Sequence, residues 1–339
     1  MNKTIIDSYL TYFDKCQNED KFCIYIDFPF CLSNCEYCIY RSLNYTQNKG
    51  RINEYIDSVI NQLESCSELF KKRTPDSIYF GGGTPSLWPF DALERIKKSI
   101  PNYEKIKYKK AELHPSNLNK ETMDFWINSM KLCIASIGVQ SFDNNSCQKQ
   151  HRIWVSEDKI KDIVRYFHQH EVWVNIDLVA LFGGDTPDYW DIYKKDISTA
   201  CEKILPDVIT TVPNYRTKLD YYEQVSKMRA ILTEHCGSIY NPFKPDMLSQ
   251  DAETILMYGK NDHWIATKEY WDYISKNFRY SCSGILKATS PKHQITLGFG
   301  GCGDHKCYSY LPDNSLLFYS FYDYDLGGYH YQYVRKCDE

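Results

Sequence analysis

Six short segments rich in β-forming residues alternate with helix-like segments between residues 22 and 214. The strand-like segments are 22–27, 77–80, 108–113, 133–139, 173–181 and 207–212. Successive parallel strands need a long crossover connection, which is usually a helix. The alternation therefore predicts an α/β fold with a parallel sheet covered by helices. We interpret it as a partial (β/α)6 barrel, in which chemistry takes place at the carboxyl ends of the strands.

Two of the intervening segments have clear helical patterns. Residues 51–63 place Ile52, Tyr55, Ile56, Val59 and Leu63 on one stripe. Ser156 can cap a second helix, whose apolar residues follow at i, i+3, i+4 and i+7. A third helix is expected to begin near Thr186 and Pro187.

The pattern changes after residue 215, so we predict a barrel domain at 1–215 and a smaller mixed C-terminal lobe at 216–339. The lobe begins with helical segments at 220–236 and 251–260 and continues as a tyrosine-rich stretch. Gly327-Gly328 predicts a hairpin in which Tyr324 faces Tyr331 and Tyr322 faces Tyr333. Its tyrosines either cover the barrel as core residues or form a stacking wall for a flat substrate.

Composition excludes several classes of partner. The 339 residues carry a net charge of −4, which argues against nucleic acid or an anionic membrane. No apolar run reaches the roughly 18 residues that a membrane span needs. Asp7 and Asp14 interrupt the region where a secretory signal would be apolar. We therefore expect a cytoplasmic protein whose fourteen cysteines stay reduced.

Three of these cysteines, Cys31, Cys35 and Cys38, follow the first strand with the spacing C-x3-C-x2-C. A structural zinc site needs four ligands, and no fourth cysteine or histidine lies nearby. A cubane [4Fe–4S] cluster that only transfers electrons also takes four cysteines. Three thiolates would leave one iron open for a ligand that is not protein. The triplet therefore predicts an iron–sulfur site at which a substrate or cofactor binds to iron.

Four further motifs give the chain a family resemblance. They are residues 25–31 (YIDFPFC), 80–86 (FGGGTPS), 137–142 (IGVQSF) and 175–178 (NIDL). With the cysteines they resemble, in order, the motifs of the radical S-adenosylmethionine (SAM) superfamily. Within it, the chain is most similar to the oxygen-independent coproporphyrinogen III oxidase-like family. The resemblance covers about residues 22–215.

The resemblance implies a role for each residue in these motifs. Cys31, Cys35 and Cys38 would hold the cluster, and the amine and carboxylate of SAM would chelate its open iron. The backbone of Gly81, Gly82 and Gly83, with Thr84, would approach the cofactor closely because glycine lacks Cβ. A simple tight turn is the alternative for this segment.

The remaining implied contacts are charged or polar side chains. Arg152 suits the SAM carboxylate because its planar fork matches two oxygens, and a surface ion pair is its alternative. Asp177 and Gln140 suit the ribose hydroxyls, although a buried structural Asp is also open. Glu112 would hold the SAM ammonium. Tyr25 would hydrogen-bond to SAM beside the cluster, or simply pack.

Departures from the family leave the reaction open. Asp27 stands where the family has histidine, and no further cysteine follows Cys38 closely. We therefore favour a tailoring enzyme that modifies an unactivated carbon of a small molecule or peptide, as a methyltransferase using two SAM molecules. Oxidase-like decarboxylation is the alternative within the enzyme class. A heme-binding and trafficking protein is the alternative outside it.

The resemblance also implies an electron donor such as flavodoxin or ferredoxin. Because an iron left open for SAM is exposed to oxidants, we expect an anaerobic or oxygen-protected cytoplasm.

Overall fold

We describe the chain from a computed structural model. It describes residues 21–38, 42–214, 216–236, 263–266, 294–302, 305–310, 317–322 and 329–333, with scattered positions between residues 6 and 14. The predicted helix at 251–260 lies outside these residues.

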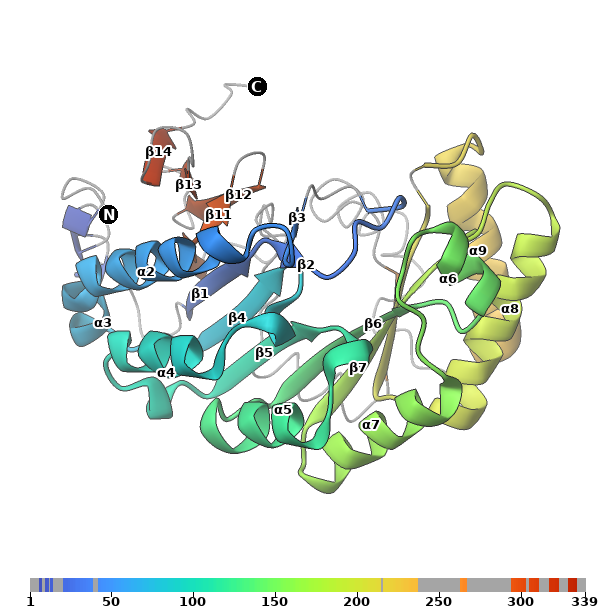
Figure 1. Cartoon of the computed structure of the whole chain (residues 1–339), viewed down its shortest axis with the longest axis horizontal. Helices are drawn as coiled ribbons and strands as arrows, with labels where there is room; N and C mark the ends of the chain where they lie inside the picture. Colours follow the sequence, from blue (N-terminus) through green and yellow to red (C-terminus); the bar gives the residue numbers. More distant parts are fainter. Residues whose placement is uncertain are drawn as a thin grey trace.

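A parallel sheet of seven strands forms the centre of the molecule (Figure 1). Its strands, in spatial order, are β10 (Gln294–Phe299), β1 (Lys21–Phe28), β4 (Ser77–Gly82), β5 (Tyr108–Leu113), β6 (Ile134–Gln140), β7 (Trp173–Val179) and β8 (Val208–Val212). The six predicted strands are all present, and the order is open rather than closed. The predicted α/β partial barrel is confirmed.

Helices cover the outer face of this sheet (Figure 1). The long ones are α2 (Lys49–Ser65), α4 (Phe90–Ser99), α7 (Glu157–Gln169), α8 (Asp188–Thr199) and α9 (Tyr221–Cys236). Shorter helices are α3 (Ser67–Lys72), α5 (Lys120–Asp124) and α6 (Asn144–Lys149), and single turns are η1 (Pro85–Leu87), η2 (Tyr103–Lys105), η3 (Pro115–Asn117), η4 (Phe125–Ser129) and η5 (Ala200–Ile204). The predicted stripe of α2 is buried throughout, and Ser156 accepts the Lys159 N–H as the cap of α7.

The two faces of the sheet differ in chemistry because side chains alternate along each strand. Toward the helices the strands bury apolar residues such as Ile24, Phe80 and Ile176, each 0% exposed. The opposite, inner face carries polar residues: Tyr25, Tyr79, Lys110, Glu112, Ser136, Asn175 and Asp177. The sheet thus packs through one face and offers a polar lumen on the other.

The strands of the C-terminal part extend the sheet at both edges. Strand β9 (His263–Ala266) runs antiparallel to β8, while β11 (Gly301–Cys302), β12 (His305–Tyr310), β13 (Leu317–Tyr322) and β14 (Tyr329–Tyr333) continue beyond β10. The division at residue 215 stays a prediction, although β10 pairs directly with β1.

The predicted C-terminal hairpin is confirmed, but its predicted register is wrong. Tyr322 pairs with Tyr329 instead of Tyr333, and the predicted turn at Gly327-Gly328 lies outside the described residues. Because the register shifts by an even number of residues, the residues predicted to share one face of the hairpin still share it.

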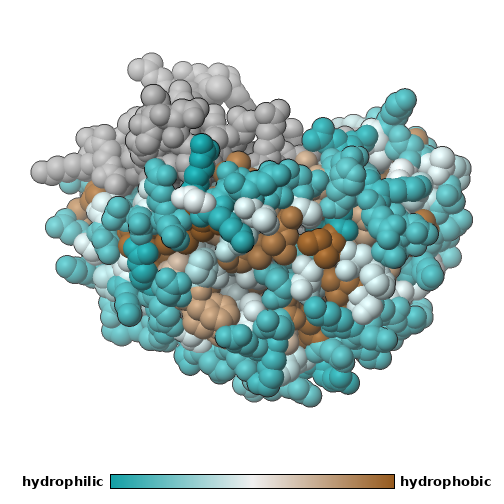
Figure 2. Space-filling model, in the orientation of Figure 1, coloured by the Kyte–Doolittle hydropathy of each residue, from teal (hydrophilic) through white to brown (hydrophobic). Residues whose placement is uncertain are grey.

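No helix in the described part of the chain is long and apolar enough to cross a membrane. The face seen in Figure 2 is mainly hydrophilic, and its hydrophobic residues gather toward the middle of the view.

Candidate active site

The three cysteines lie on a loop that leaves the carboxyl end of β1. Cys31 belongs to β2 (Phe30–Cys31), which pairs in parallel with β3 (Leu43–Asn44). The Tyr45 N–H donates to the Cys31 carbonyl at 2.7 Å, and the Cys38 N–H donates to the Cys35 carbonyl at 3.2 Å. Backbone hydrogen bonds therefore fix both ends of the triplet.

Two of the thiols already face hydrogen-bond donors. The Thr84 hydroxyl donates to Cys31 Sγ at 3.3 Å, and Arg152 Nη1 lies 3.8 Å from Cys35 Sγ. Burial raises the pKa of the Cys31 thiol, while the hydroxyls of Ser42 and Thr84 and the charge of Arg152 act in the opposite direction. These donors would stabilise thiolates, which are the form that binds iron.

The donor set fits a cluster better than a single ion. Among the described residues, no three His, Cys, Asp or Glu side chains are grouped closely enough to hold one metal ion. A cubane cluster presents a separate iron to each thiolate, so its ligands need not converge on one point. Cys31, Cys35 and Cys38 form no disulfide bonds. The triplet, with its flanking donors, is thus compatible with a [4Fe–4S] cluster.

The glycines at the carboxyl end of β4 form a cradle that a side chain would fill. A Cβ on Gly81 would lie 2.6 Å from the Tyr25 hydroxyl, and one on Gly83 would lie 2.9 Å from Cys31 Sγ and 2.8 Å from the Phe30 carbonyl. Gly82 has a φ of +104° and packs against the Asp27 carboxylate. These contacts bring the glycine motif, Tyr25 and the first cysteine together.

The Gly83→Ala substitution should therefore displace Cys31. The φ of Gly83 lies outside the left-handed region, so the effect of the added methyl group is steric rather than conformational. We expect the iron content after reconstitution to fall severalfold. Gly50→Ala is the matched control, because nothing lies within 4 Å of its Cβ position. Gly50 is the second residue of α2, so the change should leave the stability unchanged or raise it by less than about 1 kcal/mol. Iron analysis and thermal unfolding measure both variants, and equal iron content in the two would contradict the cradle.

Arg152 joins the cysteine loop to the end of β6. Its Nη1 donates to the Tyr37 hydroxyl at 3.2 Å, and its Nη2 donates to the Gly138 carbonyl. A Cβ on Gly138 would lie 2.8 Å from Gln140 Nε2 and 3.2 Å from Arg152 Nη2. The absence of that Cβ lets both side chains approach the lumen. Arg152 therefore acts as a clamp that holds the cysteine loop against the end of β6, and it is also a candidate to bind the SAM carboxylate.

Gln140 has a strained backbone at the end of β6. Its φ is +70°, and the register with β7 shifts between Gly138 and Gln140. A non-glycine residue in the left-handed region costs of order 1–3 kcal/mol, and such outliers and bulges cluster at functional sites. The strained backbone therefore occurs at Gln140, a residue that the sequence motif also predicts to be functional.

Glu112 belongs to a charged cluster on the lumen side of β4 and β5. It accepts a hydrogen bond from the Tyr79 hydroxyl, and Lys110 Nζ lies 4.9 Å from the centroid of the Tyr79 ring. Burial raises the pKa of Glu112 to about 7, against the opposing effects of Tyr79 and Lys110. A cation placed here would find a carboxyl that ionises readily near neutral pH.

Asp177 is fixed by a polar network at the end of β7. Ser136 Oγ donates to it at 3.1 Å, and Asn175 Nδ2 donates at 2.7 Å. The Thr210 hydroxyl on β8 donates to the side-chain oxygen Oδ1 of Asn175 at 2.8 Å. Burial raises the pKa of Asp177, and the charge of Lys110 with the two hydrogen bonds opposes that rise.

These contacts link the sequence-predicted residues into a continuous patch along the carboxyl ends of β1, β4, β5, β6 and β7. Sequence reasoning missed three members: Tyr37, Tyr79 and Lys110. The last two share the inner face with Tyr25 and Glu112, so the period of two along β4 and β5 could have found them. Lys110 belongs to a run of basic residues with Lys109, a pattern typical of a solvated edge, but Lys109 is only 3% exposed.

A sequence profile of the radical SAM superfamily matches residues 25–197, from β1 into α8. The chain belongs to the radical SAM superfamily. This superfamily uses a [4Fe–4S] cluster and SAM, and its enzymes need a substrate and an electron donor. The match covers all the residues of the patch described above.

Relatives within the superfamily carry two kinds of name. The chain is 30% identical to the heme chaperone HemW of Lactococcus lactis over 187 residues, 54% of this chain and 47% of that protein. It is 27% identical to HemW of Buchnera aphidicola (subsp. Acyrthosiphon pisum) over 294 residues, 83% of this chain and 69% of that protein. The oxygen-independent coproporphyrinogen-III oxidase-like protein HemZ of Bacillus subtilis is 24% identical over 200 residues, 57% of this chain and 39% of that protein.

A solved structure shares the fold. Coproporphyrinogen III oxidase of Escherichia coli superposes with a TM-score of 0.63 at 17% identity, over 94% of this chain and 69% of that one. Several curated relatives are matched over less than half of their length, for example 47% of the Lactococcus protein.

Proposed function

We propose that this protein is a radical SAM enzyme whose Cys31, Cys35 and Cys38 hold a [4Fe–4S] cluster at the mouth of the partial barrel. The observation that carries the proposal is the contact of the cysteine loop with the glycine cradle, in which Thr84 and Gly83 meet Cys31. When bound, the cluster would supply one electron to SAM, giving methionine and a 5′-deoxyadenosyl radical. That radical would then take a hydrogen atom from an unactivated carbon of the substrate.

The protein's own contribution is position and charge. The backbone of Gly81 to Gly83 would lie along the SAM amino-acid moiety, with Tyr25 beside it. Arg152 would bind the carboxylate, Glu112 the amino group, and Gln140 and Asp177 the ribose. The lumen that holds these groups is lined by fixed polar side chains, which need no rearrangement to receive a charged cofactor.

SAM binding should depend on pH through Glu112. Its pKa in the free protein is about 7, so it is largely neutral at pH 6, and the N–H groups of the SAM amine would favour its charged form as hydrogen-bond donors. Binding should release a proton below pH 7, and affinity should rise about tenfold per pH unit at most, then level off above pH 7. Titration calorimetry in two buffers of different ionisation enthalpy measures the number of protons released on binding. Glu112→Gln should reduce the slope without abolishing it, because the SAM amine itself loses a proton when it binds iron. An unchanged slope in that variant would assign the whole dependence to groups other than Glu112.

The finer proposal is transfer of a methyl group to carbon with two SAM molecules. One SAM, cleaved with one electron, would give methionine and, after it takes the substrate hydrogen atom, 5′-deoxyadenosine. The other SAM would give its methyl group to the substrate radical and leave as S-adenosylhomocysteine, and the electron donor would supply the second electron that this step needs. Reduced, reconstituted protein incubated with SAM and candidate substrates should form both nucleosides in matched amounts. Deoxyadenosine without S-adenosylhomocysteine would reject methyl transfer and favour oxidase-like decarboxylation.

Heme binding is the second candidate, because a relative named heme chaperone matches 83% of this chain. A chaperone should take up heme stoichiometrically, with a strong visible absorption band, and cleave SAM little. Titration with heme and with SAM in parallel separates the two proposals. We expect SAM cleavage and no saturable heme binding.

A further inference from the structure

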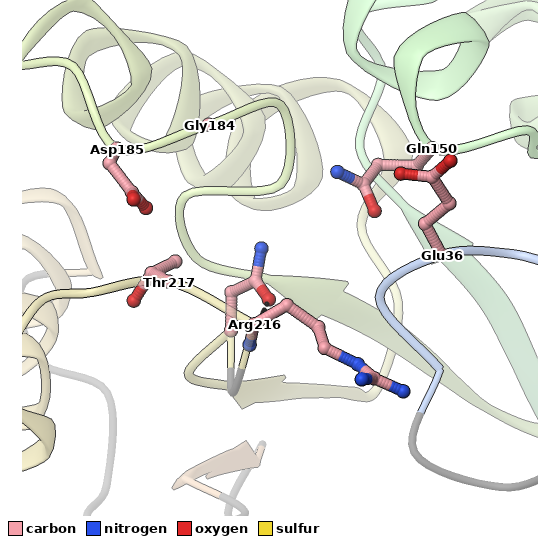
Figure 3. Close-up of a pocket in the computed structure, with 7 residues that line it drawn as sticks. Glu36, Gln150, Gly184, Asp185, Arg216 and Thr217 are labelled. Carbon is pink, nitrogen blue, oxygen red and sulfur yellow. Dashed lines mark hydrogen bonds between the residues drawn. The ribbon is translucent and has the colours of Figure 1, made fainter.

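A second feature of the mouth is a pocket beyond the patch already described. It has a volume of about 490 Å³, within the range typical of small-molecule sites. It lies beside the cysteine loop and past the carboxyl ends of β7 and β8 (Figure 3). Its lining residues are Glu36, Gln150, Gly184, Asp185, Asn214, Arg216 and Thr217.

Arg216 supplies the positive charge of this pocket. Asn214 builds the turn that presents it: Nδ2 donates to the Leu181 carbonyl at 3.0 Å, and Oδ1 accepts the Arg216 N–H at 2.9 Å. The guanidinium reaches the Cys38 carbonyl at 3.4 Å, so it lies against the cysteine loop. Among the described residues no carboxylate pairs with Arg216, and its side chain is exposed.

Gln150 supplies an unused acceptor. Its backbone is engaged on both sides, since its N–H donates to Ser146 and its carbonyl accepts from Glu36 at 3.1 Å. Its side-chain oxygen is buried, yet no donor in the described part of the chain reaches it. A buried acceptor without a donor is unfavourable, so a ligand that brings an N–H to this point would be bound preferentially. Figure 3 shows the Gln150 amide directed into the space that Arg216 also borders.

The two carboxylates that line the pocket restrict the charge that a ligand can carry. Glu36 pairs with His151 at 3.4 Å, and Asp185 accepts the Lys218 N–H at 3.2 Å. Two carboxylates against one guanidinium disfavour a ligand with several negative charges. A ligand with a single carboxylate and adjacent N–H donors matches both Arg216 and the acceptors around it.

We propose that this pocket binds the substrate through a single carboxylate with a neighbouring N–H, as in a peptide carboxyl end or an amino acid. Arg216 binds the carboxylate through its planar fork, and the Gln150 side-chain oxygen accepts the N–H. The inference rests on the proposed function, because the contact with Cys38 puts this ligand next to the site of SAM cleavage.

Calorimetric titration of the unreduced, reconstituted protein tests the pocket without any turnover. The probes are N-acetylglycylglycine, its C-terminal amide and free glycine. We expect the acid to bind about 10- to 100-fold more tightly than the amide, the range of a charge-assisted hydrogen bond. Arg216→Met should remove that preference, and Arg216→Lys should keep part of it. Arg165→Met is the matched control, because Arg165 pairs with Asp162 on the surface of α7.

Each outcome decides the proposal. Tighter binding of the dipeptide acid indicates a peptide end, and tighter binding of glycine indicates an amino acid. Equal binding of acid and amide, no binding of either acid, or an unaffected Arg216→Met variant would overturn it. Failure of SAM cleavage with these affinities intact would reject the proposed function and leave the carboxylate site standing.

Discussion

Replacing Cys31 by serine is expected to abolish the iron–sulfur site and SAM cleavage together. A serine hydroxyl is a poor ligand for iron, and two thiolates cannot hold a cluster that needs at least three. Iron should fall from about four atoms per chain to near zero. Formation of 5′-deoxyadenosine should drop by at least about 10³-fold, which corresponds to more than about 4 kcal/mol of activation free energy.

Cys133→Ser provides the matched control for this variant. Cys133 Sγ accepts the Lys109 N–H at 3.1 Å, beside the start of β6 and at the opposite end of that strand from Gln140. It is a thiol of the same chain that our proposal gives no role in chemistry. Iron analysis and chromatographic assay of the nucleosides should show it unchanged. Retention of four irons in Cys31→Ser, or equal iron loss in both variants, would exclude the triplet as the ligand set.

The parallel core could be predicted because its signals are local. Each of the six strands is a short run of β-forming residues, and each crossover helix shows its own stripe, as Ile52 to Leu63 do in α2. The right-handed order of such units leaves few topologies open. Small differences remain at the ends: α8 begins at Asp188, one residue later than the Thr186-Pro187 signal suggests.

The C-terminal pairings could not be predicted in the same way. Strand β10 pairs in parallel with β1, more than 250 residues earlier in the chain, and no local pattern specifies such a partner. The predicted register of the hairpin between β13 and β14 was wrong for a related reason. The Gly-Gly pair is a strong local turn signal, but the pairing of Tyr322 with Tyr329 does not centre the hairpin on it, and a local signal alone does not set the register.

In the candidate site, too, the features that depend on local sequence could be predicted, and those that depend on long-range contacts could not. Cysteine spacing and the glycine motif identify the cluster loop and its cradle from sequence, because both depend on neighbours in the chain. The hydrogen-bond partners of each predicted residue come from distant parts of the chain, so the sequence does not identify them. Tyr79 beneath Glu112, and Tyr37 beside Arg152, emerge only when β4, β5 and the loop after β6 are assembled. Sequence therefore named most of the polar groups, while the structure shows how each is held.

Arg152→Met is expected to show whether this side chain acts on the cofactor, the cysteine loop or both. The substitution removes the donors to the Tyr37 hydroxyl, the Gly138 carbonyl and Cys35 Sγ. If Arg152 also binds the SAM carboxylate, affinity for SAM should fall about 10- to 100-fold, the range of one charge-assisted hydrogen bond. Arg152→Lys should recover little, because an ammonium cannot replace a planar fork that serves several acceptors.

Iron content separates the two roles. A variant that keeps its iron but binds SAM weakly would assign Arg152 to the carboxylate. A variant that loses iron in parallel would assign it to the clamp, since Tyr37 and Cys35 belong to the cysteine loop. Arg165→Met, a surface substitution on α7, should change neither quantity. Because Arg152 contacts both β6 and the loop, we expect both quantities to fall, with SAM affinity falling further. Unchanged SAM affinity in Arg152→Met would remove this residue from the cofactor site.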